Sequence, residues 1–416
     1  MRKVRAGIAV LLAVLLVAGI AGAVAGFPAV HVAKRQGVAV DWSNQAVTAN
    51  GTLTYRSAAA SNRSVVAPLG SNVHDCALVD INGTGHTRWR HFITYRGPWC
   101  RAQFIATPLV STIHGRPTVL VAMKNTFYGF DEATGNVVLK KHLANMGFTA
   151  PVVVHSNDPL IVYPTMNGTV YAFHPNGTTA WKHHLGSYAT GEQPQVVRPT
   201  SDGPPVVVVG GAKNIVGYDP NGSVAWRRNV SGRFLRAGHV DGRPIVVAAS
   251  EYHVTGLYAN GTVAWRHPTN ESMTVGAVGA PHPGAPALAY VTDDSGSVLG
   301  LYASNGTVAW QRSLHSYRRY VPPPALGSLT GDGRQQVVVG AVNGRVRILD
   351  ASTGAVMATY DRGVNLWTRP TILAGRDGHP DEAVLTYKDG RIVVLRYTGS
   401  SLPSWRVSLG RWSVTV

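Results

Sequence analysis

Three oxygen-bearing side chains in this sequence have the spacing of a calcium-binding turn. Asp80, Asn82 and Thr84 alternate along the chain just before Gly85, as in the opening of a calcium loop. Loops of the EF-hand kind end on a carboxylate that binds through both oxygens, and His91 stands at that position here. We therefore prefer a plain hairpin turn and keep these three residues as weak metal candidates.

Other patterns that would indicate catalysis are missing from the sequence. The 16 histidines are dispersed and form no HExxH motif, and there is no Gly-x-Ser-x-Gly elbow or P-loop. The acidic pairs Asp293-Asp294 and Asp381-Glu382 could suit glycoside hydrolysis, but they fall in expected surface turns. We predict no catalytic residues.

The two cysteines of the chain, Cys76 and Cys100, are candidates for a disulfide. In an exported chain, two cysteines at this separation form a disulfide more often than not. Closing a loop of that size would stabilise the fold by roughly 3–4 kcal/mol in the chain-entropy model.

Ten Asn-x-Ser/Thr sites could accept N-linked glycans in an exported protein. Asn-Gly is also favoured in hairpin turns, which explains many of these sites without glycosylation. Asn62, Asn229 and Asn270 are not followed by glycine, so turn chemistry does not explain them. We expect glycosylation where the host has the pathway. The ten asparagines are Asn50, Asn62, Asn82, Asn167, Asn176, Asn221, Asn229, Asn260, Asn270 and Asn305.

The N-terminal segment predicts export. Met1–Arg5 is positively charged, and Gly7 to Phe27 contains no charged residue. About 20 apolar residues suffice to cross a bilayer as a helix, and positive charge before them favours keeping that end in the cytoplasm. We interpret residues 1–27 as a transmembrane anchor or a signal peptide with small-residue cleavage sites. A loose likeness to an archaeal prepilin leader leaves a third fate open.

The chain carries a formal net charge of +17. Long-range attraction would favour acidic partners, such as an acidic surface polymer. The charges are scattered, and the sequence contains no basic helix and no RNA-binding signature. We predict a solvated basic surface and no nucleic-acid partner.

The sequence contains eight copies of one pattern, and the fold that they form would position the candidate residues. Each copy ends a strand, turns at a glycine and enters a further strand, with about 45 residues between successive turns, the size of a four-stranded propeller blade. A closed ring of such blades removes the exposed edges of an open sheet. We expect eight blades, with seven as the alternative count. The turn glycines are Gly85, Gly135, Gly177, Gly222, Gly261, Gly306, Gly354 and Gly399.

A tryptophan follows the turn glycine at one register in six copies. We predict that each indole packs against the next blade and fills the wedge between the two. Leu139 and Ala358 stand at this register in the other copies, so those contacts should be thinner. A basic residue usually comes next, which protects an outer strand from edge-to-edge pairing. The expected docking residues are Trp89, Trp181, Trp226, Trp265, Trp310 and Trp405, the last after a short insertion.

The pattern aromatic-x-Asp-x-x-x-Gly-x-x-x-Trp resembles the tryptophan-docking repeat of PQQ-dependent alcohol dehydrogenases and of their cofactor-free, BamB-type relatives. The resemblance covers roughly residues 75–410, and Asp131, Asp219 and Asp350 keep the acidic position. Quinoprotein dehydrogenases also carry a calcium-and-quinone site and a disulfide between adjacent cysteines, whereas Cys76 and Cys100 are not neighbours. The resemblance implies the non-enzymatic, binding branch, without PQQ or calcium as cofactor.

These observations predict an all-β protein. One hydrophobic helix within residues 1–27 and a linker over 28–45 precede an eight-bladed β-propeller of four-stranded antiparallel blades over 46–416. We expect an extracytoplasmic scaffold, membrane-anchored or secreted, that binds protein or cell-surface polymer through the loops of one face or the central funnel. Two alternatives remain: a quinoprotein-like oxidoreductase or other propeller enzyme, and a component of a surface coat or pilus-like assembly. The oligomeric state is not set by the sequence.

Overall fold

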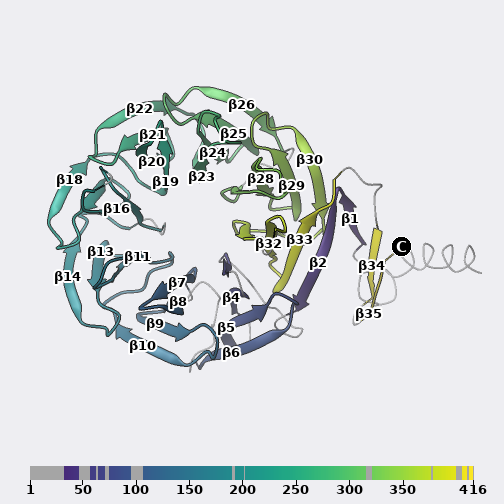
Figure 1. Ribbon diagram of the computed structural model, residues 1–416, viewed down its shortest axis with the longest axis horizontal. Coiled ribbons are helices and arrows are strands. Elements are labelled where there is room, and N and C mark those ends of the chain that lie inside the picture. Colours follow the sequence, from purple (N-terminus) through teal and green to yellow (C-terminus); the bar gives the residue numbers. More distant parts are fainter. Residues whose placement is uncertain are drawn as a thin grey trace, which may run out of the picture.

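The eight repeats form a closed ring of eight four-stranded antiparallel blades (Figure 1). The computed structural model describes residues 32–45, 57–61, 64–70, 75–94, 106–189, 193–200, 202–314, 321–375, 378–399, 405–409 and 412–415. The prediction of eight blades is therefore confirmed. The apolar run from Gly7 to Phe27 lies outside these residues, and within them no helix is long and apolar enough to cross a membrane.

Blades 1 to 4 each use four consecutive strands, ordered from the ring axis outward. Blade 1 contains β3 (Ala59–Ala60), β4 (Ser64–Gly70), β5 (Asp75–Asn82) and β6 (Thr87–Thr94). Blade 2 contains β7 (Leu109–Ile113), β8 (Arg116–Met123), β9 (Thr126–Asp131) and β10 (Val137–His142). Blade 3 contains β11 (Val152–Val154), β12 (Leu160–Pro164), β13 (Thr169–Phe173) and β14 (Thr179–His184). Blade 4 contains β15 (Gln195–Val197), β16 (Val206–Gly210), β17 (Ile215–Tyr218) and β18 (Val224–Arg228).

Blades 5 to 7 continue the same order, and blade 8 departs from it. Blade 5 contains β19 (Phe234–Val240), β20 (Arg243–Ala249), β21 (His253–Tyr258) and β22 (Val263–Pro268). Blade 6 contains β23 (Met273–Gly279), β24 (Leu288–Asp293), β25 (Ser297–Tyr302) and β26 (Val308–Ser313). Blade 7 contains β27 (Ala325–Gly327), β28 (Gln336–Gly340), β29 (Arg345–Asp350) and β30 (Val356–Asp361). Blade 8 contains β31 (Thr371–Leu373), β32 (Glu382–Thr386), β33 (Arg391–Tyr397) and, outermost, β2 (Val38–Gln45).

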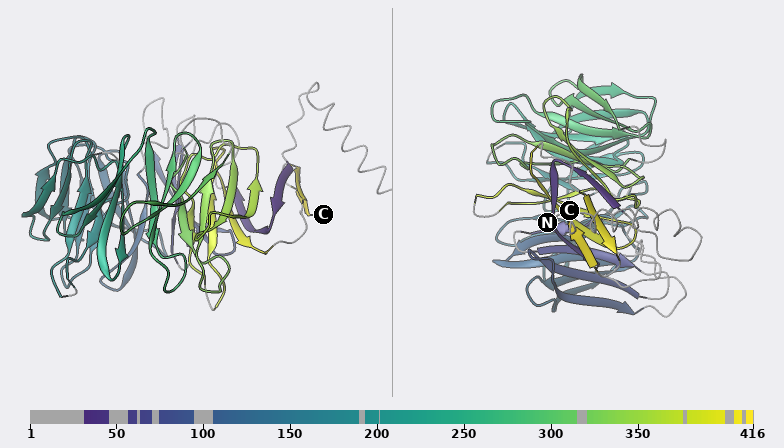
Figure 2. Two further views of the ribbon diagram at one scale, coloured as in Figure 1. Left: turned by 90° about the horizontal axis from the view of Figure 1, so that it is seen from above. Right: turned by 90° about the vertical axis from the view of Figure 1, so that its right-hand side faces the viewer.

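The antiparallel order gives the ring two distinct faces, and Figure 2 shows the strands running between them. One face, which we call the loop face, carries the loops that join each outer strand to the inner strand of the next blade, together with the turns between second and third strands. The opposite face, which we call the turn face, carries the turns between first and second and between third and fourth strands.

Apolar residues pack between neighbouring blades, and not around one central core. The two middle strands of a blade contact a neighbouring sheet on both sides, so both of their faces are apolar. Every residue of β12 and of β13 is buried, for example. Outer strands instead expose one face to water, and in β14 only Trp181 is buried. This is the pattern of a strand with one face in contact with the protein and one in water.

The N-terminal part of the chain closes the ring. The sequence predicts a linker over residues 28–45, but Val38–Gln45 forms β2 and pairs antiparallel with β33 along its length. The alternation of Val38, Val40 and Trp42 suits a half-buried strand, and the eighth blade would otherwise present β33 as an open edge. The propeller therefore begins at or before residue 38.

Three additional strands extend blade 7 outward. β1 (Val32–Gln36) pairs with β30 and also with β34 (Trp405–Leu409), which in turn pairs with β35 (Trp412–Thr415). In Figure 1 these strands project from the ring beside β30 and β2. Gly37, with a φ of 70°, provides the turn that directs the chain from β1 in blade 7 to β2 in blade 8.

Candidate functional site

One contact recurs between neighbouring blades at the register predicted from the sequence. The indole nitrogen of each of five tryptophans donates a hydrogen bond to a backbone carbonyl in the next blade, just before its turn glycine. The pairs are Trp89 with Glu132 at 2.8 Å, Trp181 with Pro220 at 2.9 Å, Trp226 with Ala259 at 2.8 Å, Trp265 with Ala303 at 2.7 Å and Trp310 with Ala351 at 3.0 Å. Each indole thus joins two blades by packing and by a hydrogen bond.

The turn glycines leave the room that these indoles need. A Cβ placed on Gly261 would lie 2.5 Å from the ring of Trp226, and one on Gly222 would lie 2.7 Å from the ring of Trp181. Both glycines also have positive φ angles, of 80° and 92°, which side chains disfavour. The turn glycine therefore serves backbone shape and interblade packing at once.

The sixth expected docking residue, Trp405, does not lie in blade 8. It stands in β34, where its backbone pairs with Lys34 of β1. Trp42 of β2 takes the docking register of blade 8 instead: it is 8% exposed, and a Cβ on Gly85 of blade 1 would lie 3.2 Å from its ring. Because the chain leaves β33 for the outside of blade 7, the fourth strand of blade 8 is supplied from the N-terminus.

The residues considered for calcium have other partners. Arg88 Nε lies 2.5 Å from the Asp80 carboxylate, so a guanidinium stands where a cation would have to bind. The Asn82 side-chain oxygen accepts hydrogen bonds from the Thr84 amide at 3.0 Å and its hydroxyl at 2.8 Å. This is a side-chain-stabilised hairpin turn, so the structure does not fit the calcium interpretation. Among the described residues, no group of three or more His, Cys, Asp and Glu side chains could hold a metal.

Asp80 belongs to a partly buried ion network that no sequence motif indicates. Arg88 also contacts Glu132 of blade 2, 3.2 Å from its carboxylate, and Ser61 and Ser64 donate to the same carboxylate at 2.6 and 2.8 Å. Burial raises the pKa of Asp80 despite the hydrogen bond from Arg88. Burial opposes ionisation of Glu132 too, but the two serines and the charge of Arg88 lower its pKa below the ordinary value. The network joins blades 1 and 2.

The described glycosylation candidates lie at the surface. Asn82 is partly exposed, and the seven others are exposed. Five occupy equivalent turns between third and fourth strands on the turn face, namely Asn82, Asn176, Asn221, Asn260 and Asn305. Asn167, Asn229 and Asn270 lie on the loop face. Asn50 and Asn62 lie outside the described residues, as does Cys100, so both glycosylation and the pairing of Cys76 with Cys100 stay predictions.

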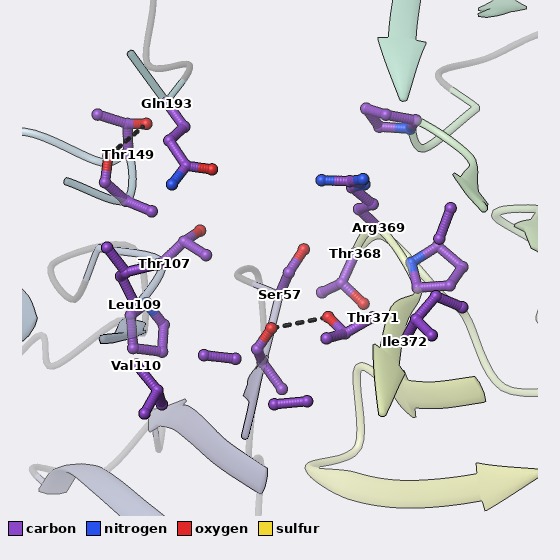
Figure 3. A pocket seen from close by; sticks show the side chains of 18 of the residues that line it. Ser57, Thr107, Leu109, Val110, Thr149, Gln193, Thr368, Arg369, Thr371 and Ile372 are labelled. Carbon is purple, nitrogen blue, oxygen red and sulfur yellow. Dashed lines mark hydrogen bonds between the residues drawn. The ribbon is translucent and has the colours of Figure 1, made fainter. Parts of the chain in front are cut away.

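A cavity of about 380 Å³ lies on the ring axis, where the chain enters the inner strands (Figure 3). Small and apolar residues from β3, β7, β27 and β31 form much of its wall. Ser57, Thr107 and Gln193 add polar groups that face the central space in Figure 3. Most wall residues directly precede an inner strand, so the cavity lies toward the loop face.

Two arginines give this cavity its charge. Arg236 of β19 and Arg369, which precedes β31, both line it. Arg236 Nε and an Arg369 terminal nitrogen donate to the same carbonyl, that of Gly276, at 2.9 and 2.6 Å. Arg236 also donates to the Leu235 carbonyl at 2.6 Å. Backbone carbonyls therefore orient both guanidinium groups.

The chemistry of the described lining suits binding of an anion. It includes no Asp, Glu or His, so both of its charged groups are guanidiniums. A guanidinium stays protonated and presents several donors in one plane, which matches carboxylates and phosphates. None of these described lining groups is a usual general base near neutral pH.

The comparisons with known proteins agree with the propeller fold. The sequence profile of the family described as outer membrane protein assembly factor BamB matches residues 166–402, more than half of the chain. The chain belongs to this family. The match covers most of blades 3 to 8 of the BamB-type propeller. No curated protein sequence matches the chain.

Solved structures with the same fold have varied functions. BamB from Moraxella catarrhalis superimposes with a TM-score of 0.62 at 14% identity, over 86% of this chain and 100% of that one. Sqt1 from Saccharomyces cerevisiae gives 0.62 at 10% identity, over 85% and 99%. Quinohemoprotein alcohol dehydrogenase from Comamonas testosteroni gives 0.58 at 11% identity, over 88% and 77%. At these identities the likeness establishes the propeller fold alone.

The two cavity arginines were missed by sequence reasoning for a physical reason. Neither belongs to the turn-and-tryptophan pattern, and each stands on or beside a short inner strand that the repeat marks weakly. Arg369 stands directly before Pro370, one of the prolines that mark the start of an inner strand, and this was the available signal. Arg236 has no comparable marker, and only the fold brings it to the axis.

Proposed function

We propose that this BamB-type propeller is a non-enzymatic binding scaffold outside the cytoplasm, and that its partner presents carboxylate or other anionic groups to the axial cavity. The paired guanidiniums of Arg236 and Arg369 carry this proposal. They meet at one carbonyl within a cavity of about 380 Å³, a size that suits a side chain, a chain end or a sugar unit. The net charge of +17 would attract an acidic partner from a distance.

Location outside the cytoplasm is supported by the sequence before the propeller. The positive residues Met1–Arg5 and the uncharged run that follows are typical of a segment that exports what comes after it. Membrane attachment would place the ring close to a surface, because β1 begins at Val32, only five residues after Phe27. The partner is then a protein or an acidic polymer of that surface.

Binding of acidic oligomers tests this function. Oligogalacturonate and an oligo-glutamate peptide would be titrated into the full chain by calorimetry at low and at physiological salt. The double variant Arg236→Gln/Arg369→Gln should weaken binding at least tenfold, because it removes both cationic groups from the cavity. The affinity of the wild-type chain should also fall as salt rises.

A matched control removes the same charge elsewhere. Arg243 and Arg334 lie on the turn face, at or near the start of the second strands of blades 5 and 7, and both are exposed. Arg243→Gln/Arg334→Gln should bind the oligomers almost as the wild type does. Equal loss in both double variants would reduce the effect to net charge and contradict a site in the cavity. A spectral change or a stabilisation on adding PQQ with calcium would favour the oxidoreductase instead.

A further inference from the structure

The docking register of blade 2 has surroundings like those of the docked tryptophans but carries a leucine, Leu139. Leu139 stands there on β10, paired across the strands with Gly129 of β9. Blades 4, 5 and 6 show the same glycine beneath their indoles, at Gly217, Gly256 and Gly300. In front of Leu139 lies the turn glycine of blade 3, Gly177, with a φ of 87°.

The contacts of the cross-strand glycine differ between Leu139 and the docked tryptophans. A Cβ on Gly217, Gly256 or Gly300 would lie 2.4–2.6 Å from the indole above it. The nearest atoms to a Cβ on Gly129 would be the Leu139 Cβ at 2.9 Å and methyl groups of Leu120 and Thr118 at 3.5 Å. Leu139 therefore lies less close to its glycine than the indoles do in the other blades, and a side chain smaller than an indole stands at this register.

The hydrogen-bond acceptor for an indole is also retained. Trp181 donates to the carbonyl of Pro220, which stands in a Pro-Asn-Gly turn. Pro175 stands at the same place in the Pro-Asn-Gly turn of blade 3, one blade after Leu139. In the described part of the chain, no donor contacts the Pro175 carbonyl oxygen. This acceptor points to an occupant with an N–H group.

A hollow of about 320 Å³ occupies this place, between blades 2 and 3, whose outer strands β10 and β14 are neighbours on the rim (Figure 1). Its floor is mostly apolar, and its edge carries His114, Arg116 and Asp131. Val138 lines the hollow and is 57% exposed, so the apolar surface continues to the outside. The floor consists of Ile113, Thr118, Leu120, Leu139 and Pro175.

Blade 7 also lacks a tryptophan at its docking register, but there the space is filled, so the two blades can be compared. Ala358 of blade 7 pairs with Ile348, not with a glycine, so a branched side chain occupies the space beneath the register. A Cβ on Gly37, next to β1, would lie 3.1 Å from the Ala358 Cβ. In blade 7 the Ile348 side chain thus fills the space that a tryptophan would need, whereas in blade 2 a hollow borders Leu139.

We propose that the hollow between blades 2 and 3 binds an indole ring, presented as a tryptophan side chain by a partner protein. The ring packs against Leu120 and Leu139, and its N–H donates to the Pro175 carbonyl. This site lies on the rim of the ring, away from the axial cavity, and it does not depend on the function proposed for that cavity.

Filling the hollow from within tests the proposal. Leu139→Trp introduces the residue that docks on the next blade in five other blades, so it should fold and raise the melting temperature. N-acetyl-L-tryptophanamide would be titrated into the full chain and followed by saturation-transfer NMR. The wild type should bind it in the millimolar range, and Leu139→Trp should reduce its affinity at least tenfold.

Three further measurements keep the result specific. The 1-methylindole analogue, which lacks the N–H, should bind several-fold more weakly than the parent probe. Val356→Trp adds the same side chain at an exposed position of blade 7 and should leave probe binding unchanged. Val138→Glu changes a side chain that is 57% exposed and should weaken binding by placing a charge at the mouth.

Two outcomes would overturn the proposal. Absence of probe binding to the wild type, or equal binding by wild type and Leu139→Trp, would show that the hollow is not an indole site. Self-association that Leu139→Trp abolishes would identify a second copy of the chain as the occupant and contradict a separate partner protein.

Discussion

Replacing Trp42 by alanine tests the ring closure on which the architecture depends. Trp42 is 8% exposed and packs against the turn of blade 1 at Gly85. Truncating a buried tryptophan costs about 3–5 kcal/mol. Its indole nitrogen has no hydrogen-bond partner in the described structure, so the loss comes from packing alone. For a chain of 416 residues, an unfolding entropy of about 2.1 cal/mol/K per residue makes 1 kcal/mol correspond to about 1.1 °C, so the melting temperature should fall by roughly 3–6 °C.

Trp405 provides the matched comparison. The repeat pattern alone gives the two residues the opposite ranking, because it places Trp405 in the docking register. In the structure Trp405 belongs to β34, outside blade 8. Because Trp405 stands outside the docking register of blade 8, Trp405→Ala should leave the closure of blade 8 on blade 1 intact.

Urea unfolding of both variants, followed by circular dichroism, would measure these costs. Hydrogen exchange should show that Trp42→Ala selectively exposes the amides of β2 and β33, because their pairing closes the ring. Trp226→Phe, which loses a hydrogen bond as well as ring area, should cost more than Trp42→Phe by about 1 kcal/mol. A larger loss for Trp405→Ala than for Trp42→Ala would refute the closure described here.

Two further predictions concern single positions between blades. Because the folded pKa of Glu132 is lower than its ordinary value, the unfolded chain binds more protons below about pH 4.5, and stability falls on acidification. Glu132→Gln should therefore lose less stability between about pH 5 and pH 3.5 than the wild type does, as measured by urea midpoints at the two pH values. Asp80, whose pKa is raised, contributes with the opposite sign in both proteins. Gly261→Ala should lower stability by about 2–4 kcal/mol, since it combines a positive φ with a contact 2.5 Å from Trp226; an unchanged urea midpoint would contradict the packing role of the turn.

Much of the propeller could be predicted because its repeat combines a backbone requirement with a packing requirement. Positive φ at the turn and a large flat side chain four residues later leave a signal that survives divergence. The closing strand left none, because β2 has no turn glycine of its own pattern before it and pairs with a strand more than 300 positions away. The insertion before Trp405 was the one sign that the last copy differs from the others.

The candidate sites were harder to foresee than the fold. Arg236 and Arg369 become neighbours only when the ring closes, since 133 positions separate them. The sequence did indicate that Leu139 would give a thinner contact, but it could not distinguish an open hollow from a compensated one. That distinction depends on Gly129 and Ile348, the cross-strand partners of Leu139 and Ala358, and hence on pairing register.

Pairing β2 with β33 also determines when the molecule can finish folding. Asp41 and Arg396, which form an ion pair across this junction, are 355 positions apart. At a synthesis rate of about 5–20 residues per second, the first strand waits roughly 20–70 s for its partner to be made. Throughout that interval its backbone donors and acceptors are a template for foreign chains. A holding chaperone, or translocation of the completed chain, would therefore protect the newborn protein until its two ends meet.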